Sequence, residues 1–543
     1  MKEWIITLHN KNDLESFYED METPGGQLYI PGRAVQCSDK RPISRNTHYM
    51  LEDDEVDLIR QDPRVWDLDL KELVDLTTKP AYKITNGDFA KDFNLDSGDT
   101  NWGLLRHVEE LNRSNWGDPG TSLVVDDVEI TSSGKNVDVV IVDGHIDPAH
   151  PEFAVNPDGT GGSRVVQENW FSHGGSGTYV YDRSGSYTNA ADRNDNNHGC
   201  HCGGTVAGNT QGWARDANVY NISPYGTNPN GTVNIWDYMR EWHNTKPVNP
   251  VTGRKNPTIS NHSYGSSIEV GYSGSYNTGL VTRVNFRGVD FNPGRDLTAA
   301  ELQARGFYAQ STSGFSIPNY FTSRFADIQD AIDDGIIVVC SAGNDAWKTV
   351  KSTDQDYNNS YYMTYNGSNY FWYLHRGTGS GAGFANAINV GAMSNNVAED
   401  KAIFSNCGSQ VDIFAAGEAI QSSLHSGYGP DARNSTYRLG KYQGTSMSGP
   451  QVAGVLAILA QQDPNMTQTE AQAWLDTVST YDEMFDSEAD DPMDTDSLQG
   501  APNKILRWIN QRPAAGKSFP VVNFKPRPTA SIVWPRGRVR KRG

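Results

Sequence analysis

Long apolar runs are missing from this sequence. The longest, such as Val455–Ala460, are far shorter than the ~20 apolar residues that a membrane-spanning helix needs. The N-terminus reaches Asn10, Lys11 and Asp13 almost at once, so it lacks the uninterrupted apolar core of a secretory signal. We therefore expect no membrane partner and an intracellular or particle-associated protein.

Cysteine and positive charge are also scarce. Five cysteines in 543 residues are an odd, sparse set that does not suit a disulfide framework, which indicates a reducing compartment. The 46 Lys and Arg against 66 Asp and Glu leave a net charge of −20, which argues against a general nucleic-acid binder. The remaining composition, 36% hydrophobic with 53 glycines, is that of an ordinary globular protein with a large core.

The first 80 residues predict a small α+β domain with its own modest core. Strand-like and helical patterns alternate twice within it. Strands are expected at 4–8, 48–51 and 65–70, and helices at 14–18 and 53–61. Residues 81–100 are expected to form a linker, because 86–100 are polar and rich in Gly and Asp.

Residues 101–512 predict one large α/β domain. Short apolar runs bounded by Gly, Asn or Asp are typical of buried parallel strands, and they occur at 137–142, 217–222, 257–260, 335–340 and 387–390. Helical patterns cover 321–332 and 450–461. We expect a doubly wound, mostly parallel sheet whose ligands bind at the carboxyl ends of its strands.

Three segments of this domain bring Asp, His and Ser, in that order, to strand ends or helix starts. Asp143 follows the first predicted strand, His198 opens a glycine-rich segment, and Ser446 precedes a small-residue helix. Each alone has a simple structural explanation, as a turn former, a structural histidine and a helix N-cap.

Together these segments resemble the subtilisin-like serine proteases of the peptidase S8 family. The motifs that carry the resemblance are GTSMSGP at 444–450, HGCHCGGTVAG at 198–208, VVCSAGND at 338–345, SNHSYG at 260–265 and FSNCGSQVDIFAAG at 404–417. The resemblance covers most of 101–480 and implies the subtilisin-like fold.

The resemblance also implies the roles of the site residues. Ser446 would attack the peptide carbonyl, His198 would take its proton, and Asp143 would orient His198. The Asn344 amide and the Ser446 N–H would hold the oxyanion. Substrate would bind two backbone segments, which are Ser263, Tyr264 and Gly265, and Ser341, Ala342 and Gly343. Catalysis needs no cofactor, and structural calcium is an option in this family, although no EF-hand spacing supports it.

The sequence departs from the family pattern in two places. Gly144 and His145 follow Asp143, where the family has Ser or Thr and then Gly. The sequence therefore does not decide which groups hold the Asp143 carboxylate in place. Cys200 and Cys202 flank His201, which suggests a zinc set with His198. We expect packing and no metal, because positions 200 and 202 point to different faces of a helix.

The first 80 residues resemble the inhibitory propeptide of the same family, and 101–106 resemble a mature N-terminus. We expect the residues after Leu70 to block the cleft and the chain to be cut between 77 and 101. The alternative is a permanently attached accessory domain.

Two insertions, 266–318 and 347–373, follow the two substrate-binding segments and either extend the cleft or pack on the surface. Residues 482–496 hold eight acidic residues, and 513–543 form a basic tail. The tail is expected to be solvated rather than to bind nucleic acid.

The sequence thus predicts a serine endopeptidase made as a self-processing zymogen, with protein or peptide substrates and its own propeptide as partners. Two alternatives remain. One is a catalytically impaired scaffold, and the other is a dedicated maturation protease of a viral or other assembly.

Overall fold

The computed structural model describes residues 2–33, 35–40, 44–70, 82–84, 102–108, 128–173, 197–223, 233–265, 267–271, 280–293, 295–309, 314–318, 322–377, 386–396, 399–488 and 497–509. Within these ranges no helix has the length and apolarity required to cross a bilayer. The predicted basic tail and most of the predicted linker lie outside the described residues.

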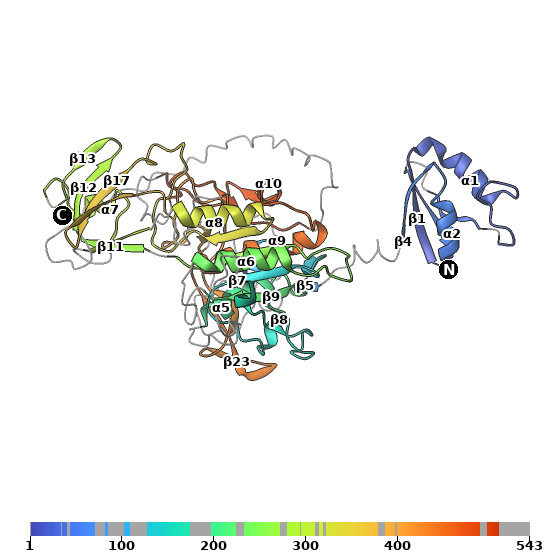
Figure 1. Cartoon of the computed structure of the whole chain (residues 1–543), viewed down its shortest axis with the longest axis horizontal. Coiled ribbons are helices and arrows are strands. Elements are labelled where there is room, and N and C mark those ends of the chain that lie inside the picture. The colour runs from blue at the N-terminus through green and yellow to red at the C-terminus, as the bar shows by residue number, and fades with distance from the viewer. Residues whose placement is uncertain are drawn as a thin grey trace, which may run out of the picture.

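A nine-stranded sheet forms the centre of the large domain (Figure 1). All its neighbouring strands pair in parallel except β24 and β25, which are antiparallel. In sheet order the strands are β24 (Thr480–Tyr481), β25 (Lys504–Ile505), β20 (Ile413–Ala416), β19 (Ile388–Met393), β16 (Ile337–Ser341), β10 (Thr258–His262), β7 (Asp138–Val142), β9 (Asn218–Ile222) and β8 (Val165–Val166).

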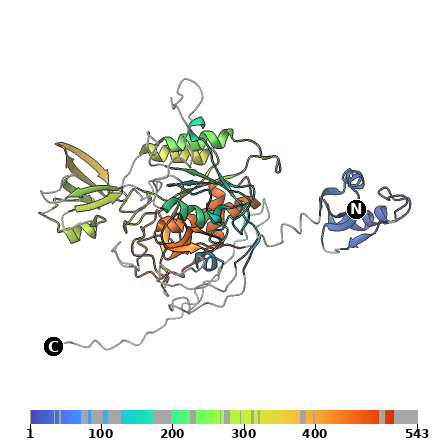
Figure 2. The ribbon, with the colours of Figure 1, turned by 90° about the horizontal axis from the view of Figure 1, so that it is seen from below.

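Both faces of this sheet are covered by helices. Strand β7 shows why, because Val139 and Ile141 join one hydrophobic cluster while Val140 and Val142 join another. Helices α5 (His198–Ala207), α9 (Thr445–Gln462) and α10 (Gln468–Val478) contribute to the first cluster. Helices α6 (Val233–Thr245) and α8 (Thr322–Asp333) contribute to the second and run alongside each other in Figure 2. The doubly wound α/β prediction is confirmed.

The predicted strands of this domain all appear, within one to three residues of their expected bounds. The main difference is helix α9, which begins at Thr445 instead of residue 450. The pattern of apolar residues begins only after Pro450, whereas the helix itself already includes Ser446. This early start places Ser446 in the first helical turn.

The N-terminal residues fold into a four-stranded antiparallel sheet with two α-helices, and they form a separate unit in Figures 1 and 2. The strand order is β2 (Cys37–Asp39), β3 (Asn46–Leu51), β1 (Lys2–Leu8) and β4 (Val65–Leu70), with η1 (Lys11–Asp13), α1 (Leu14–Glu22) and α2 (Asp53–Ile59) between them. Phe17, Met21 and Ile59 are fully buried in a core of their own. The predicted small α+β domain is confirmed.

Among the described residues, three short elements lie in sequence between this unit and the first strand of the main sheet. Strand β5 (Tyr82–Ile84), at the start of the predicted linker, pairs with β6 (Val128–Ile130). Helix α4 (Trp102–Arg106) is fully buried, and its Trp102 Nε1 donates to Glu418 O at 2.8 Å. Residues 102–106 are therefore integrated into the large domain.

The two insertions build one further sheet together. Its main path runs β14 (Tyr308–Ala309), β15 (Gly314–Pro318), β11 (Ser267–Gly271), β12 (Leu280–Phe286), β17 (Ser360–Tyr365) and β18 (Ser368–Tyr373), with β13 (Val289–Phe291) paired to β12 and α7 (Ala299–Gln303) nearby. Trp347 Nε1 donates to Ser316 O at 3.2 Å, which ties the second insertion to the first. This sheet has its own hydrophobic core, including Phe307, Phe315 and Tyr361.

A three-stranded antiparallel sheet packs against helix α5. It consists of β21 (Ile420–Leu424), β23 (Asn434–Tyr442) and β22 (Gly429–Asp431). Residues 420–442, which include all three of these strands, are called the hairpin below. The chain runs directly from this hairpin into Ser446. Short 3-10 helices η2 (Pro151–Phe153) and η3 (Trp170–His173) complete the elements.

Candidate active site

Asp143 and His198 lie in direct contact at the carboxyl end of strand β7. His198 Nδ1 is 2.8 Å from Asp143 Oδ1 and 2.9 Å from Oδ2. Asp143 is 2% exposed, whereas the His198 side chain keeps 32% of its surface open to solvent. The histidine is therefore held on its inner side by a buried carboxylate, and its outer side is accessible.

The support of Asp143 comes from the backbone. Gly144 N donates to Asp143 Oδ1 at 2.7 Å, and Asn221 Nδ2 donates to Gly144 O at 2.9 Å. A Cβ at Gly199, next to His198, would collide with the Gly144 carbonyl, so the Asp143 and His198 segments touch through their main chains. Gly144 has no hydroxyl to add to this support, so its N–H is the group that it donates to Asp143.

The electrostatics of His198 follow from this contact. Burial by itself would lower the pKa of His198, but the Asp143 carboxylate raises it, and the net effect is a pKa well above 6.5. Burial also raises the pKa of the neighbouring Cys202 thiol. Burial thus disfavours the Cys202 thiolate, and Asp143 is the charge that favours protonated His198.

Ser446 lies in the first turn of α9, after Gly444, whose φ of 145° favours glycine. Pro450 is four residues further on and has no N–H, so the Ser446 carbonyl lacks its usual helical donor. Ser263 Oγ and Cys202 Sγ contact that carbonyl instead, at 3.1 and 3.3 Å. Because Pro450 cannot donate to it, the Ser446 carbonyl is left to accept contacts from Ser263 and Cys202, and these contacts hold the serine in place.

Cys202 connects the histidine and the serine. Besides contacting Ser446 O, its Sγ is 3.9 Å from His198 Nδ1, one helical turn away. The Ser446 hydroxyl itself donates to Ser263 O at 3.2 Å, and Ser446 is 8% exposed. Asp143, His198 and Ser446 are therefore gathered in one place from three separate segments.

Asn344 lies beside the start of α9. Its Oδ1 accepts from Thr445 N at 2.8 Å and from Thr445 Oγ1 at 2.7 Å. Because the amide oxygen is occupied, the Nδ2 donor is turned the other way, and Asn344 is exposed. A Cβ at Gly444 would lie 3.3 Å from Asn344 Nδ2, a contact that is tighter than usual.

The two predicted substrate segments follow neighbouring parallel strands. Ser263, Tyr264 and Gly265 continue β10, and Gly265 is exposed. Ser341, Ala342 and Gly343 end or follow β16, and all three are buried. Backbone bonds already engage this second segment: Ala342 N donates to Val390 O, Gly343 N to Thr445 Oγ1, and Asn406 N to Gly343 O. A substrate strand could pair with the first segment, while the second is suited to walling a pocket.

The four suggested zinc ligands do not converge. His201 Nε2 donates to Ile420 O at 2.8 Å, and Cys200 Sγ is 3.7 Å from Ser423 Oγ. Ile420 and Ser423 belong to the hairpin, so the His201 and Cys200 side chains both bind there and not beside Cys202. A different trio, Asp143, His198 and Cys202, does bring one donor atom each to within 4.8 Å of one another.

Sequence reasoning missed three roles in this arrangement. Thr445 orients Asn344. Ser263, which was predicted only to bind substrate, is bonded to Ser446 through both its hydroxyl and its carbonyl. Cys202, which was considered only as a zinc ligand or a packing residue, contacts both His198 and Ser446. A signal for Cys202 existed, because it lies four residues after His198 and so on the same helix face. The other two depend on segments far apart in the sequence.

The profile of the subtilase family matches residues 134–503, about two thirds of the chain. The chain belongs to the subtilase family. The matched region includes the Asp143, His198, Asn344 and Ser446 segments.

Individual relatives of this subtilase are distant. A subtilisin of Bacillus pumilus is 30% identical over 164 residues, which are 30% of this chain and 46% of that protein. Subtilisin-like protease 2 of Pseudogymnoascus destructans is 25% identical over 358 residues, 66% of this chain and 58% of that protein. The chain thus spans about half the length of the curated relatives it matches. A solved cold-adapted subtilisin-like serine proteinase is 20% identical, with a TM-score of 0.43, over 75% of this chain and 98% of that one.

Proposed function

We propose that this subtilase is a serine endopeptidase with Ser446 as nucleophile, His198 as general base and Asp143 as the orienting acid. The observation that carries the proposal is the buried Asp143 carboxylate bonded to His198 Nδ1 at 2.8 Å, beside a serine at the start of a long helix. This is the arrangement that activates a weak hydroxyl nucleophile.

The first chemical step requires a movement of the Ser446 side chain. Its hydroxyl now donates to Ser263 O and has to turn toward His198 Nε2, the ring nitrogen that does not face Asp143. His198 then takes the hydroxyl proton as Oγ attacks the peptide carbonyl, and later gives that proton to the leaving amine. Asp143 stabilises the imidazolium formed between these steps.

The negative oxygen of the tetrahedral intermediate would be held by Asn344 Nδ2 and the Ser446 N–H. Thr445 fixes the amide so that its donor side is available, and the positive end of the α9 dipole lies at the same place. Electrostatic stabilisation of an oxyanion requires donors that are fixed before the reaction, and the two bonds from Thr445 support this role for Asn344.

Substrates would be protein or peptide chains. An extended peptide would pair with the backbone of Ser263–Gly265, while Ser341, Ala342 and Gly343 would wall the pocket for the residue before the cut bond. No cofactor is needed for this chemistry.

The test is covalent labelling with a fluorophosphonate, read by intact mass. The wild-type chain should gain one adduct, and a Ser446→Ala variant should gain none. An unlabelled wild-type chain of full length would point to a blocked zymogen or to a catalytically impaired scaffold, and an unlabelled shortened chain would point to a misassigned nucleophile or to cutting by another protease.

We further propose that the N-terminal unit is an inhibitory propeptide that the enzyme cuts off between residues 77 and 101. The support is its separate core and its sequence resemblance. The same mass measurement tests this, because only the wild-type chain should be shortened, whereas Ser446→Ala should stay whole. A full-length chain that is fully active would instead make the unit a permanent accessory domain.

Turnover of casein separates a general endopeptidase from a dedicated maturation protease. Rapid hydrolysis of casein would support broad specificity. Fluorophosphonate labelling without casein hydrolysis would support action on one partner within an assembly.

A further inference from the structure

The hairpin of residues 420–442 touches all the segments that carry the proposed triad. It packs on α5, which begins with His198, and its last strand runs through Gly444 into Ser446. It also contacts the loop after Asp143, where His150 Nε2 bonds to Arg438 O at 2.9 Å. A shift of this hairpin would therefore displace all three proposed catalytic residues.

Strand β21 is bonded directly to the first turns of α5. Ser422 Oγ donates to His201 O and Ser423 Oγ to Cys200 O, each at 2.8 Å. Gly204, on the same helix face, allows this approach, because a Cβ there would collide with both serine hydroxyls. The main chains of α5 and β21 therefore lie close enough for serine hydroxyls of β21 to reach carbonyls of α5.

These bonds are costly to break. Ser422 and Ser423 have no exposed surface, so a hydroxyl that lost its acceptor would remain buried and unsatisfied. His201 adds a third bond to the same strand through Ile420 O, and its ring stacks on Tyr442 at 4.8 Å. Burial lowers the pKa of His201 to about 3, so this ring stays neutral and keeps the same bond over a wide pH range.

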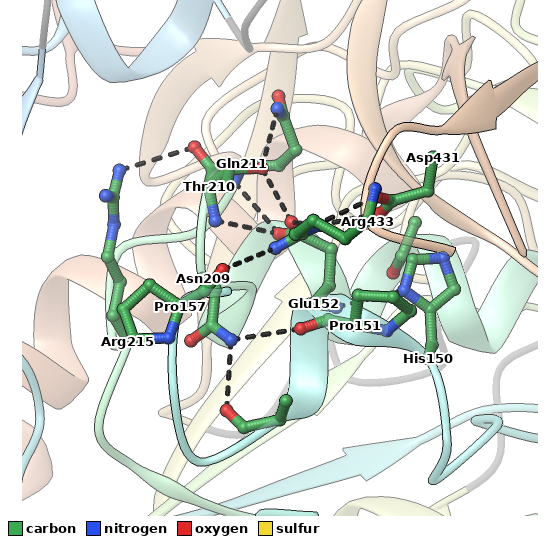
Figure 3. Close-up of polar contacts among 12 residues, drawn as sticks. His150, Pro151, Glu152, Pro157, Asn209, Thr210, Gln211, Arg215, Asp431 and Arg433 are labelled. Atoms are coloured by element: carbon green, nitrogen blue, oxygen red, sulfur yellow. Dashed lines mark hydrogen bonds and ion pairs between the residues drawn. The ribbon is translucent and has the colours of Figure 1, made fainter. Parts of the chain in front are cut away.

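The far end of the hairpin is held just as firmly (Figure 3). Arg433 forms ion pairs with Glu152 and Asp431. Glu152 is fully buried and also accepts from Thr210 N at 3.0 Å and Gln211 N at 3.1 Å, just beyond the end of α5. Since both ends of α5 are tied to the hairpin, the helix has little freedom to slide.

We propose that Ser422 and Ser423 are positioning residues for His198, acting through the α5 carbonyls to which they donate. His198 must lie within hydrogen-bonding distance of Asp143 and Ser446 at once, and displacements of about 1 Å in such a site cost on the order of 10²-fold in rate. The serines fix the helix relative to β23, the strand that leads into Ser446. This inference rests on the proposed endopeptidase function.

The test compares Ser422→Ala/Ser423→Ala with Thr436→Ala, an exposed residue of the same hairpin, using a chromogenic peptide substrate. We expect kcat of the double variant to fall roughly 10- to 100-fold with KM within about twofold. The single variants should each show a smaller fall, and they serve if the double variant does not fold. The control should match the wild type.

A second measurement separates positioning from stability alone. The pKa of His198, followed by NMR in a Ser446→Ala background, should be lower in the double serine variant, because a displaced helix weakens the bond to Asp143. If melting temperature falls while kcat and the His198 pKa stay at wild-type values, the hydroxyls only stabilise the fold and the positioning role is wrong. A wild-type chain that has lost its N-terminal unit and still neither labels with fluorophosphonate nor cleaves peptide overturns the endopeptidase function itself, and the positioning role with it.

Discussion

Asn344 and Thr445 are coupled through two hydrogen bonds, from the Thr445 N–H at 2.8 Å and its hydroxyl at 2.7 Å to Asn344 Oδ1. Thr445 immediately precedes Ser446, so the proposed oxyanion donor is aligned by the helix that carries the proposed nucleophile. The alignment does not depend on substrate.

Replacing Asn344 by Ala should therefore lower kcat with little change in KM, because the lost donor acts on the transition state. The expected loss is about 10²–10³-fold, the size found for the oxyanion asparagine of a subtilisin. Thr445→Val, which keeps the N–H bond and removes the hydroxyl bond, should lose less. Steady-state kinetics on a peptide substrate would check both, and equal losses in the two variants would argue against this division of roles.

Asp143→Asn should change both the rate and its pH dependence. The Asp143 charge raises the His198 pKa, and only neutral His198 can act as a base, so wild-type activity should rise with pH through a value above 6.5. In Asp143→Asn that charge is absent and burial alone acts on His198, so the His198 pKa should fall. The rise of activity with pH, the acidic limb of the profile, should then occur at lower pH. The loss of the correct tautomer should also reduce kcat by about 10⁴-fold.

Asp147→Asn is the matched control for this variant, because Asp147 follows in the same loop and pairs with exposed His425 at 3.2 Å. Its pH–rate profile should stay close to the wild type. An unchanged acidic limb in Asp143→Asn would remove Asp143 from the proposed triad.

Ionised Asp345 should lower the free energy of unfolding at pH values above about 6. Burial raises the pKa of Asp345 to about 6, above its value in the unfolded chain. The stability linked to its protonated form is complete below about pH 4 and is lost as pH rises through 6. Asp345→Asn should thus be more stable than its parent at pH 8, by at most about 3 kcal/mol, with the difference vanishing near pH 4. Urea unfolding in a Ser446→Ala background would measure this, and exposed Asp333→Asn should show no such trend.

Arg106 and Glu399 form an ion pair in which neither side chain has exposed surface, with Nε and Nη2 each 2.7 Å from a carboxylate oxygen. Removing either partner leaves a buried charge, so Arg106→Met or Glu399→Leu should each cost about 3–5 kcal/mol of unfolding free energy. The double variant should recover most of that loss. Additive losses would show that the two residues do not act as a pair.

The exposed pair Arg60–Asp67 offers a comparison, with side chains 48% and 58% accessible. Its removal should cost less than about 1 kcal/mol, since solvent screens the charges.

The architecture of the large domain was predictable because its signal is local. Val139 to Val142 are apolar at every position, which only a strand covered on both faces requires, and the structure places alternate residues in two clusters. The residues of the proposed triad were predictable from motifs around Asp143, His198 and Ser446. Helix α9 was partly missed, because its first turn is polar and lacks the apolar pattern that marks the rest.

The insertions were not predictable in the same way. Residues 266–318 and 347–373 are separated by β16 and α8, and their strands β12 and β17 pair only in the folded chain. Strand pairing over such a distance leaves no period in the local sequence, so the sequence predicted only that each segment extends the cleft or packs on the surface.

Local residue patterns settled the strands of the central sheet, the small N-terminal domain and the identities of the proposed catalytic residues, since each depends on near neighbours along the chain. The tertiary structure alone decided how they are held. Pro450 withholds a donor from Ser446 O, and Ser263 and Cys202, more than 180 residues away, contact it instead. Hydrogen-bond satisfaction of a buried carbonyl depends on which segments meet in space, and that is set by packing of the whole domain.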